Sequence, residues 1–380
     1  MARVKPEVEA FARIKVIGIG GSGNNGVDHM INNKVKGVEF IAINTDAQSL
    51  HHSLAPKKIH IGKNLTRGLG AGMNPDLGRQ SAEETKEEIQ DMVKGADMIF
   101  LTCGMGGGTG SGATPVIAKI AKEQGILTIA VVTKPFAFEG AQRIAIAETA
   151  LNNLKDVVDA MIVIPNDKLI QMVQKETTFS SAFAMCDEIL RQAVEGISEL
   201  ITMPGIINVD FADVKAIMQD AGSALMGIGS AQGEKRAEEA AKKAINSPLL
   251  DVSIHGAKGV LFAISGGDDL TMHEIQEAAN IITESIDPSA RVIFGALKDN
   301  KLKKNELKVT VIATGFPESV LRKQSLFQNN AVGSAGSNKE KEKNNSININ
   351  ATNTTKETSA DGEKQSEWDS VPAFLRRKRI

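Results

Sequence analysis

The sequence predicts an α/β protein in which a Rossmann-type parallel sheet is joined by a long core helix to a smaller α/β domain. In the first half of the chain, short apolar runs alternate with helical patterns, as in parallel sheets with crossover helices. Two of these runs lead into glycine-rich turns that are each followed by a helix. From residue 317 onward the chain turns polar, so we expect a disordered linker over residues 317–366 and a separate peptide at residues 367–380.

Composition sets further limits on the class of protein. The chain has 380 residues, 42% of them hydrophobic, which is enough for two domains with their own cores. A formal net charge of -2 argues against binding to nucleic acid. Cys103 and Cys186 are the only cysteines, so we expect neither a disulfide framework nor a CxxC metal clip, and no metal ligands are predicted among the side chains. Residues 1–10, predicted to be flexible, do not resemble a signal peptide, and no apolar run could span a bilayer, so a cytoplasmic protein is expected.

The first predicted strand, residues 14–19, opens a literal dinucleotide fingerprint, Gly18-x-Gly20-x-x-Gly23. The next strand ends beside Asp46, about where such a site carries its ribose-binding acid. An NAD(P)-dependent oxidoreductase is therefore one alternative. No GxxxxGK[ST] sequence occurs, which excludes a P-loop nucleotide site.

The second glycine-rich turn follows a predicted strand at residues 97–102 and has six glycines between Cys103 and Gly112. We expect the next helix over residues 113–124, because Pro115 is tolerated only in a first helical turn. Bare backbone N–H groups at the positive end of a helix stabilise phosphate. Loops after neighbouring parallel strands face one crevice, and two such turns suit a compact polyphosphate better than a dinucleotide. The pattern favours a nucleoside triphosphate.

Later pairs of residues have both a structural and a functional interpretation. A strand at residues 126–133 leads into a helix on which Glu139 and Arg143 lie one turn apart, as a surface ion pair or as ligand contacts. The core helix, residues 179–203, carries Phe183 and Asp187 on one face. These two are either a core aromatic and a solvated acid, or a platform that stacks on guanine and accepts its N1–H and N2–H. Adenine has no such pair of donors.

The chain after the core helix forms a loop and a second α/β domain. The loop contains Asn208, Asp210 and Asp213 and leads into a short helix, which we expect one of the two acids to cap. Strands are predicted at residues 225–228, 260–264, 291–297 and 307–314, with helices at 234–244 and 271–285. No cluster with chemistry of its own stands out there.

The predicted C-terminal peptide contains Trp368, the only tryptophan, and four consecutive basic residues at 376–379. Such a peptide folds when a partner protein or an anionic membrane binds it.

Residues 106–112 match the tubulin-type signature GGGTG[ST]G. With residues 20–25, Asn44-Thr45-Asp46, Asn208-x-Asp210-x-x-Asp213 and the tail Val-Pro-Ala-Phe-Leu-Arg, the chain resembles the tubulin/FtsZ GTPase family, whose bacterial members act in cell division. The resemblance extends from the first strand to the tail. One departure is Ser22, where many relatives have glycine.

This resemblance implies a tubulin-like two-domain fold that binds GTP or GDP, with Mg²⁺ held through the phosphates. The implied parts are a GTP-binding domain at 11–178, a core helix at 179–203, a catalytic loop with its following helix at 204–222, and a C-terminal domain at 223–316. Glu139 and Arg143 would contact the ribose side, and Asn166, Phe183 and Asp187 would receive guanine. Asn208, Asp210 and Asp213 would reach the γ-phosphate bound by a neighbouring subunit. The remaining nucleotide-binding residues would be Gly20, Gly21, Ser22, Gly23, Asn24, Asn25, Asp46, Gly104, Gly106, Gly107, Gly108, Thr109, Gly110 and Thr133.

The resemblance also implies a function. Such a GTPase polymerises head to tail into filaments of the bacterial division ring at mid-cell, under the inner face of the membrane. Its partners would be other copies of itself and, through residues 367–380, a membrane-tethering adaptor and division regulators. Nucleic acid and a direct membrane span are not expected. The oxidoreductase and a nucleotide-bound scaffold without turnover remain as alternatives.

Overall fold

The computed structural model describes residues 12–170, 178–203, 205–247, 254, 256–299 and 301–316. The predicted flexible N-terminus, the linker and the C-terminal peptide lie outside these described residues. No helix among them is long and apolar enough to cross a bilayer.

Within the described residues, ten strands form one sheet in the order β3-β2-β1-β4-β5-β6-β7-β10-β8-β9. The pairs from β3 to β7 are parallel, β10 is antiparallel to both β7 and β8, and β9 is parallel to β8. This arrangement confirms the predicted α/β fold with a parallel sheet and a smaller second domain. The strands are β1 (Ile14–Ile19), β2 (Val38–Asn44), β3 (Lys57–His60), β4 (Met98–Gly104), β5 (Leu127–Lys134), β6 (Ala160–Pro165), β7 (Gly222–Gln232), β8 (Gly259–Gly266), β9 (Arg291–Lys298) and β10 (Glu306–Thr314).

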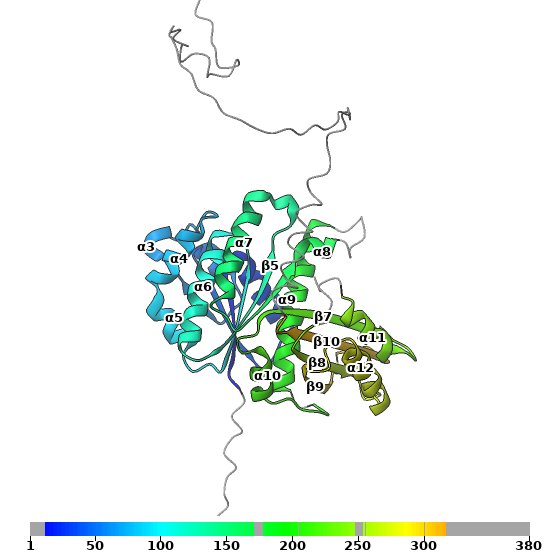
Figure 1. Cartoon of the computed structure of the whole chain (residues 1–380). Coiled ribbons are helices and arrows are strands. Elements are labelled where there is room, and N and C mark those ends of the chain that lie inside the picture. The colour runs from blue at the N-terminus through cyan, green and yellow to red at the C-terminus, as the bar shows by residue number, and fades with distance from the viewer. Residues whose placement is uncertain are drawn as a thin grey trace, which may run out of the picture. The chain divides into compact units, whose positions relative to one another are not determined.

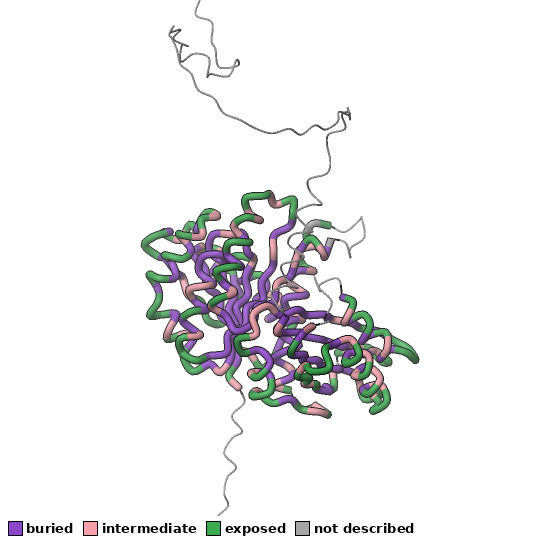
Figure 2. Tube along the Cα trace, viewed as in Figure 1, coloured by how far each residue is buried: buried purple, intermediate pink, exposed green. Residues whose placement is uncertain are grey.

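Helices cover both faces of the parallel part of the sheet (Figure 1). Side chains alternate along each strand, so Val16 and Phe100 join the core under α1 and α9, while Ile17 and Leu101 join the core under α6 and α7. The interior strands β1, β4 and β5 are accordingly buried almost throughout, whereas the helices expose their outer faces (Figure 2). A third core lies between the second half of the sheet and α11 and α12.

The helices differ widely in length. They are α1 (Gly20–Asn32), α2 (Ala47–His52), α3 (Lys63–Thr66), α4 (Pro75–Glu84), α5 (Lys86–Val93), α6 (Gly108–Glu123), the 3-10 helix η1 (Ala137–Glu139), α7 (Ala141–Lys155), α8 (Asn166–Ile170), α9 (Phe179–Thr202), α10 (Phe211–Met218), α11 (Arg236–Ile245) and α12 (Met272–Glu284).

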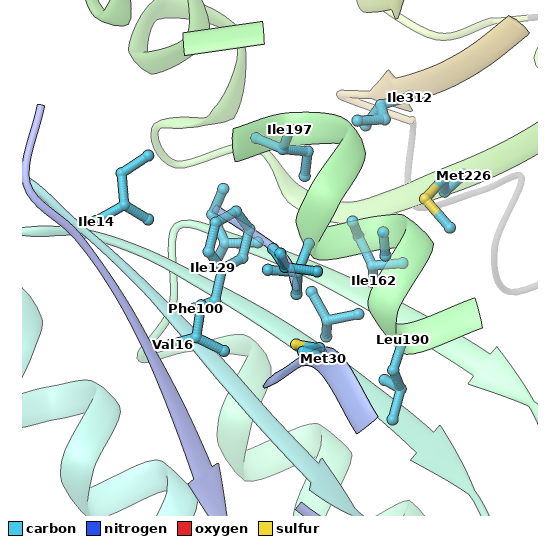
Figure 3. Packing of buried hydrophobic residues seen from close by; sticks show 14 of the residues in the cluster. Ile14, Val16, Met30, Phe100, Ile129, Ile162, Leu190, Ile197, Met226 and Ile312 are labelled. Carbon is cyan, nitrogen blue, oxygen red and sulfur yellow. The ribbon is translucent and has the colours of Figure 1, made fainter. Parts of the chain in front are cut away.

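The predicted core helix is α9, which Thr178 caps by accepting a hydrogen bond from the backbone N–H of Ser181. The middle of its apolar face, at Leu190, Val194 and Ile197, is fully buried. In Figure 3 this face meets Phe100 from the parallel half of the sheet and Ile312 from the antiparallel half. One helix therefore packs against both parts of the described chain.

Strand β7 connects the two parts and is longer than the predicted strand at residues 225–228. Its first three residues pair with β6, from Ala160 opposite Gly222 to Ile162 opposite Ala224. The rest of the strand pairs with β10. The prediction was too short because β7 contains several glycines, and glycine is depleted in strands. Gly229 has a packing role instead, since a Cβ there would lie 2.1 Å from the carbonyl oxygen of Ala240 in α11.

Two helices begin earlier than predicted, because α1 starts at Gly20 and α6 at Gly108. Their glycines lie within the helices and permit close packing: a Cβ on Gly112 would lie 1.9 Å from the carbonyl oxygen of Pro75 in α4. The prediction for Pro115 was wrong, since this residue lies inside α6 rather than in its first turn. Proline has no N–H, so α6 lacks one backbone hydrogen bond at that point.

Candidate nucleotide-binding cleft

A cleft of about 260 Å³ lies where β1, β4, β5 and β6 end. Carboxyl ends of parallel strands are the usual ligand site of open α/β sheets. The structure brings most of the predicted ligand residues to its wall. They are Gly20, Gly21, Ser22, Gly104, Gly107, Gly108, Thr109, Gly110, Thr133, Glu139, Arg143, Asn166, Phe183 and Asp187.

The two glycine-rich segments form one continuous wall of this cleft. Gly20 has a φ of +73°, which favours glycine, and a Cβ there would lie 3.2 Å from the backbone nitrogen of Gly110. At Gly21 and Gly107, by contrast, a Cβ would meet nothing within 4 Å. Bare backbone at the N-termini of α1 and α6 therefore borders open space. This is a suitable environment for the phosphate groups of a ligand.

Ser22, the departure from the family pattern, fits into this wall. A Cβ on Gly104 would lie 2.7 Å from the Ser22 hydroxyl oxygen, so the serine occupies space that the glycine leaves. Its presence does not close the cleft, since both residues line it.

The far end of the cleft is rich in hydrogen-bond acceptors. The side-chain oxygen Oδ1 of Asn166, the first residue of α8, is buried and has no hydrogen-bond partner among the described residues. Burial raises the pKa of the Asp187 carboxyl to about 6. Phe183 packs edge-to-face on Phe136 with ring centroids 5.2 Å apart. A ligand with N–H donors on an aromatic ring would satisfy both acceptors.

Glu139 and Arg143 form the predicted ion pair, with Arg143 Nη1 2.5 Å from Glu139 Oε2. They do not share one helix as predicted, because Glu139 ends the 3-10 helix η1 and Arg143 is in α7, with Gly140 at a φ of +102° between them. Glu139 also accepts a hydrogen bond from the backbone N–H of Phe136 at 3.0 Å. Since both side chains line the cleft, the ion pair fixes a guanidinium beside it. The pair can therefore be both a surface ion pair and part of a ligand site. Its contact with a ligand stays a prediction.

Several predicted ligand residues do not line the cleft but shape it. A Cβ on Gly23 would lie 2.4 Å from the carbonyl oxygen of Thr102, and one on Gly106 would lie 2.8 Å from that of Arg143. Asn24 is buried, and its amide lies within hydrogen-bonding distance of the Gly18 carbonyl oxygen, at 2.9 Å. Asn25 is exposed on α1, and Asp46 caps α2 through the backbone N–H groups of Gln48 and Ser49.

Five residues that the sequence did not predict also line the cleft: Ile19, Met105, Pro135, Cys186 and Leu190. Cys186 and Leu190 could have been found, because they lie three and seven residues after Phe183 on the same helical face.

The predicted catalytic residues lie elsewhere. Asn208 and Asp210 are exposed in the loop after α9, and Asp213 is exposed in the first turn of α10. Asn208 accepts a hydrogen bond from the backbone N–H of Gly205 at 2.6 Å. Asp210 caps α10 by accepting one from the backbone N–H of Asp213 at 2.8 Å, which confirms that one acid is a cap. The Asp213 carboxylate makes no ion pair or hydrogen bond to the described residues.

A large distance separates this acidic loop from the cleft of the same chain. Helix α9 has 24 residues and is therefore about 36 Å long. Phe183 and Asp187 lie in its first half, whereas the acids follow its last turn. In Figure 1, α8 and α10 lie toward opposite ends of α9. Within the described part of the chain, no group of three His, Cys, Asp or Glu side chains could hold a metal ion.

Comparisons with known proteins agree with this geometry. Residues 13–174 match the model of the tubulin/FtsZ family GTPase domain, and residues 222–317 match the FtsZ family C-terminal domain. An empty FtsZ dimer from M. jannaschii is 48% identical, with a TM-score of 0.78 over 81% of this chain and 89% of that chain. A tryptophan-to-tyrosine mutant of FtsZ from M. jannaschii is also 48% identical, with a TM-score of 0.77 over 80% of this chain and 92% of that chain.

More distant solved structures share the fold. GDP-bound CetZ1 from Haloferax volcanii is 22% identical, with a TM-score of 0.71 over 83% of this chain and 98% of that chain.

Proposed function

Because the chain belongs to the FtsZ family, we propose that it hydrolyses GTP and polymerises head to tail into filaments of the bacterial division ring. The observation that carries GTP binding is one cleft shared by two glycine-rich helix N-termini and an acceptor-rich end. The oxidoreductase alternative lacks support, since Asp46 caps a helix and the second glycine-rich segment has no role in dinucleotide binding.

In this proposal the residues divide the nucleotide between them. The N-termini of α1 and α6 stabilise the phosphate charge. Asp187 and Asn166 accept the N1–H and N2–H of guanine, and Arg143 lies toward the ribose. Mg²⁺ fits this site only through the nucleotide, because it prefers phosphate and water oxygens and the described chain offers no cage of its own. When bound, the ion supplies charge neutralisation.

Hydrolysis is completed between subunits in this proposal. The chain's own acids lie beyond one end of α9 and cannot reach its own phosphates. The side chains of Asn208, Asp210 and Asp213 are exposed and would face the nucleotide of the next subunit when subunits stack. A carboxylate there orients the attacking water, the role of the positioning residue in other phosphoryl transfers.

Mixing two variants that each hydrolyse GTP slowly tests whether the catalytic site is completed between subunits. Asp213→Ala removes the exposed carboxylate but keeps the cleft. Gly107→Val fills the phosphate space without meeting other atoms of the chain, and Gly107 has an extended backbone with φ of -88° that valine adopts. We expect each variant alone to hydrolyse GTP slowly. In the mixture, GTP held by Asp213→Ala meets the intact acids of Gly107→Val, so turnover should exceed the sum of the two.

The control is Asp91→Ala, which removes an exposed acid on α5 and should leave turnover unchanged. Strictly additive turnover in the mixture, with co-assembly shown by sedimentation, would contradict catalysis between subunits. Turnover measured against protein concentration separates the enzyme from a nucleotide-bound scaffold, because only an assembling GTPase has a concentration threshold.

We also propose that residues 367–380, outside the described residues, bind a membrane-tethering adaptor and division regulators. Their Trp368 and the basic residues 376–379 support this role. Such binding would hold the filaments in the cytoplasm at mid-cell, under the inner face of the membrane.

A further inference from the structure

A buried hydroxyl behind the cleft contacts one of its lining residues. Thr45, in the loop after β2, is fully buried and does not line the cleft. Its Oγ1 lies 2.6 Å from Oγ1 of Thr109, which is in the first turn of α6 and does line the cleft. Resting on GTP binding as proposed above, we infer that Thr45 is a positioning residue that orients the Thr109 hydroxyl toward the nucleotide phosphates.

The direction of the hydrogen bond follows from the charge of the ligand. Only one of two bonded hydroxyls can donate to the other. Phosphate oxygens are acceptors, so Thr109 must use its own proton on the phosphate and can only accept from Thr45. The chain of donors therefore runs from Thr45 to Thr109 to phosphate. Among the described residues, neither hydroxyl has another hydrogen-bond partner, so no second group sets this direction.

The backbone of Thr45 is fixed independently of both glycine-rich segments. Its carbonyl oxygen accepts a hydrogen bond from Thr66 Oγ1 at 3.0 Å and one from the backbone N–H of Gly70 at 3.3 Å. Thr66 itself is anchored by its backbone N–H, which donates a hydrogen bond to the carbonyl oxygen of Gly62 at 2.9 Å. These bonds hold the Thr45 hydroxyl in place before any ligand arrives. Preorganised donors of this kind stabilise charge without a rearrangement on binding.

Variants at Thr45 separate the hydroxyl from its methyl group. Thr45→Val keeps the shape and removes the donor. We expect affinity for GTP and GDP to fall about tenfold, because the Thr109 hydroxyl is then no longer held in the orientation that donates to the charged phosphate. Thr45→Ser keeps the hydroxyl and should stay within about twofold of the wild type. The matched control is Thr66→Val, which removes a bond to the Thr45 carbonyl but keeps the hydroxyl pair, and a change below about threefold is expected.

A second variant tests whether Thr45 acts through Thr109. Thr109→Val should itself weaken nucleotide binding, and adding Thr45→Val to it should cause no further loss beyond about twofold, because the route is already broken. If the double variant lost affinity by the product of the two single losses, the inference would be overturned. Equal losses of affinity in Thr45→Val and Thr66→Val would also overturn it. If Thr45→Val does not fold, Thr45→Ala compared with Thr45→Ser replaces it.

The wild type separates this inference from the proposed function. If the wild type binds GTP and Thr45→Val binds it equally well, only the positioning role fails. If the wild type does not bind GTP, the proposed function fails.

Discussion

At Asp187 the carboxyl group lies deep enough in the cleft that burial raises its pKa from 3.8 to about 6. A carboxyl with a raised pKa binds its proton more tightly in the folded chain than in the unfolded chain. Folding stability from this group is therefore present at low pH and is lost as pH rises from about 4 to about 6. Above that range the ionised, half-buried carboxylate costs about 1 kcal/mol, an amount reduced by its contact with solvent. A ligand that donates hydrogen bonds to the carboxylate removes this cost.

Base selection is the first prediction at the residue scale. Asp187→Asn presents a donor where guanine also has a donor, so GTP binding should weaken by about 1–3 kcal/mol. Xanthine carries an acceptor at that edge, so XTP binding should strengthen. Affinities for both nucleotides measured in both proteins check this. Equal GTP affinity in the two proteins would contradict the placement of guanine.

The same residue predicts a pH dependence of binding. Below its pKa of about 6, Asp187 is protonated and loses acceptor capacity, so GTP affinity should fall about tenfold from pH 7 to pH 5. The asparagine variant has no such group. Because the nucleotide phosphates titrate in both proteins, the quantity to measure is the ratio of the two affinities at each pH. A ratio that stays constant would rule out Asp187 as the cause.

At the scale of elements, the two acids near the start of α10 differ in their structural roles: Asp210 is the N-cap of the helix, whereas the Asp213 side chain caps nothing. Asp210→Ala removes the N-cap of α10 and should lower the free energy of unfolding by about 1 kcal/mol. Asp213→Ala removes an exposed carboxylate that makes no such contact and should change it by less than about 0.5 kcal/mol. Urea titration of each variant and of the wild type measures both changes in the free energy of unfolding. Both variants should impair GTP turnover, so only the stability differs, and equal stability losses would contradict the capping role.

The sequence predicted the interior strands well because their residues are apolar on both faces, as in β4 and β5. It predicted nothing between β2 and β4, where the structure has β3 and four helices. Strand β3 lies at the sheet edge and begins with the exposed Lys57 and Lys58, so it carries no apolar run. The short helices there bury few side chains each and are formed through contacts with α6 and the sheet, which local pattern does not encode.

The candidate site was predicted largely through its glycines, but the conformation assigned to them was wrong. Intrinsic propensity disfavours glycine in helices, so Gly20–Gly23 and Gly108–Gly112 were placed in turns. Packing overrides propensity here, since side chains at Gly23 and Gly112 would collide with neighbouring backbone. Such contacts join segments distant in sequence and could not be read from the order of residues.

At the scale of the whole molecule, Phe316 is the last residue that the structure describes, and it packs into the third core. The match to the FtsZ family C-terminal domain ends at residue 317. A chain truncated after Phe316 should therefore keep its melting temperature, its GTP affinity and near-normal turnover. It should lose attachment to an adaptor or to anionic vesicles, measured by co-sedimentation. A fall in melting temperature would show that the core extends further.

The two halves of the described sheet are joined by only three paired residues between β6 and β7, although α9 packs against both halves. In shear transitions packed helices slide by small amounts, and the short β6–β7 ladder offers few hydrogen bonds to resist such sliding. A subunit loaded at both ends by its neighbours would therefore yield at this seam, by shear along α9, before either half deforms. Hydrogen exchange compared between monomers and filaments would reveal that yielding at the amides of Gly222 and Ala224, which point toward β6; the Gly222 amide donates to the carbonyl oxygen of Asp159 at 2.9 Å.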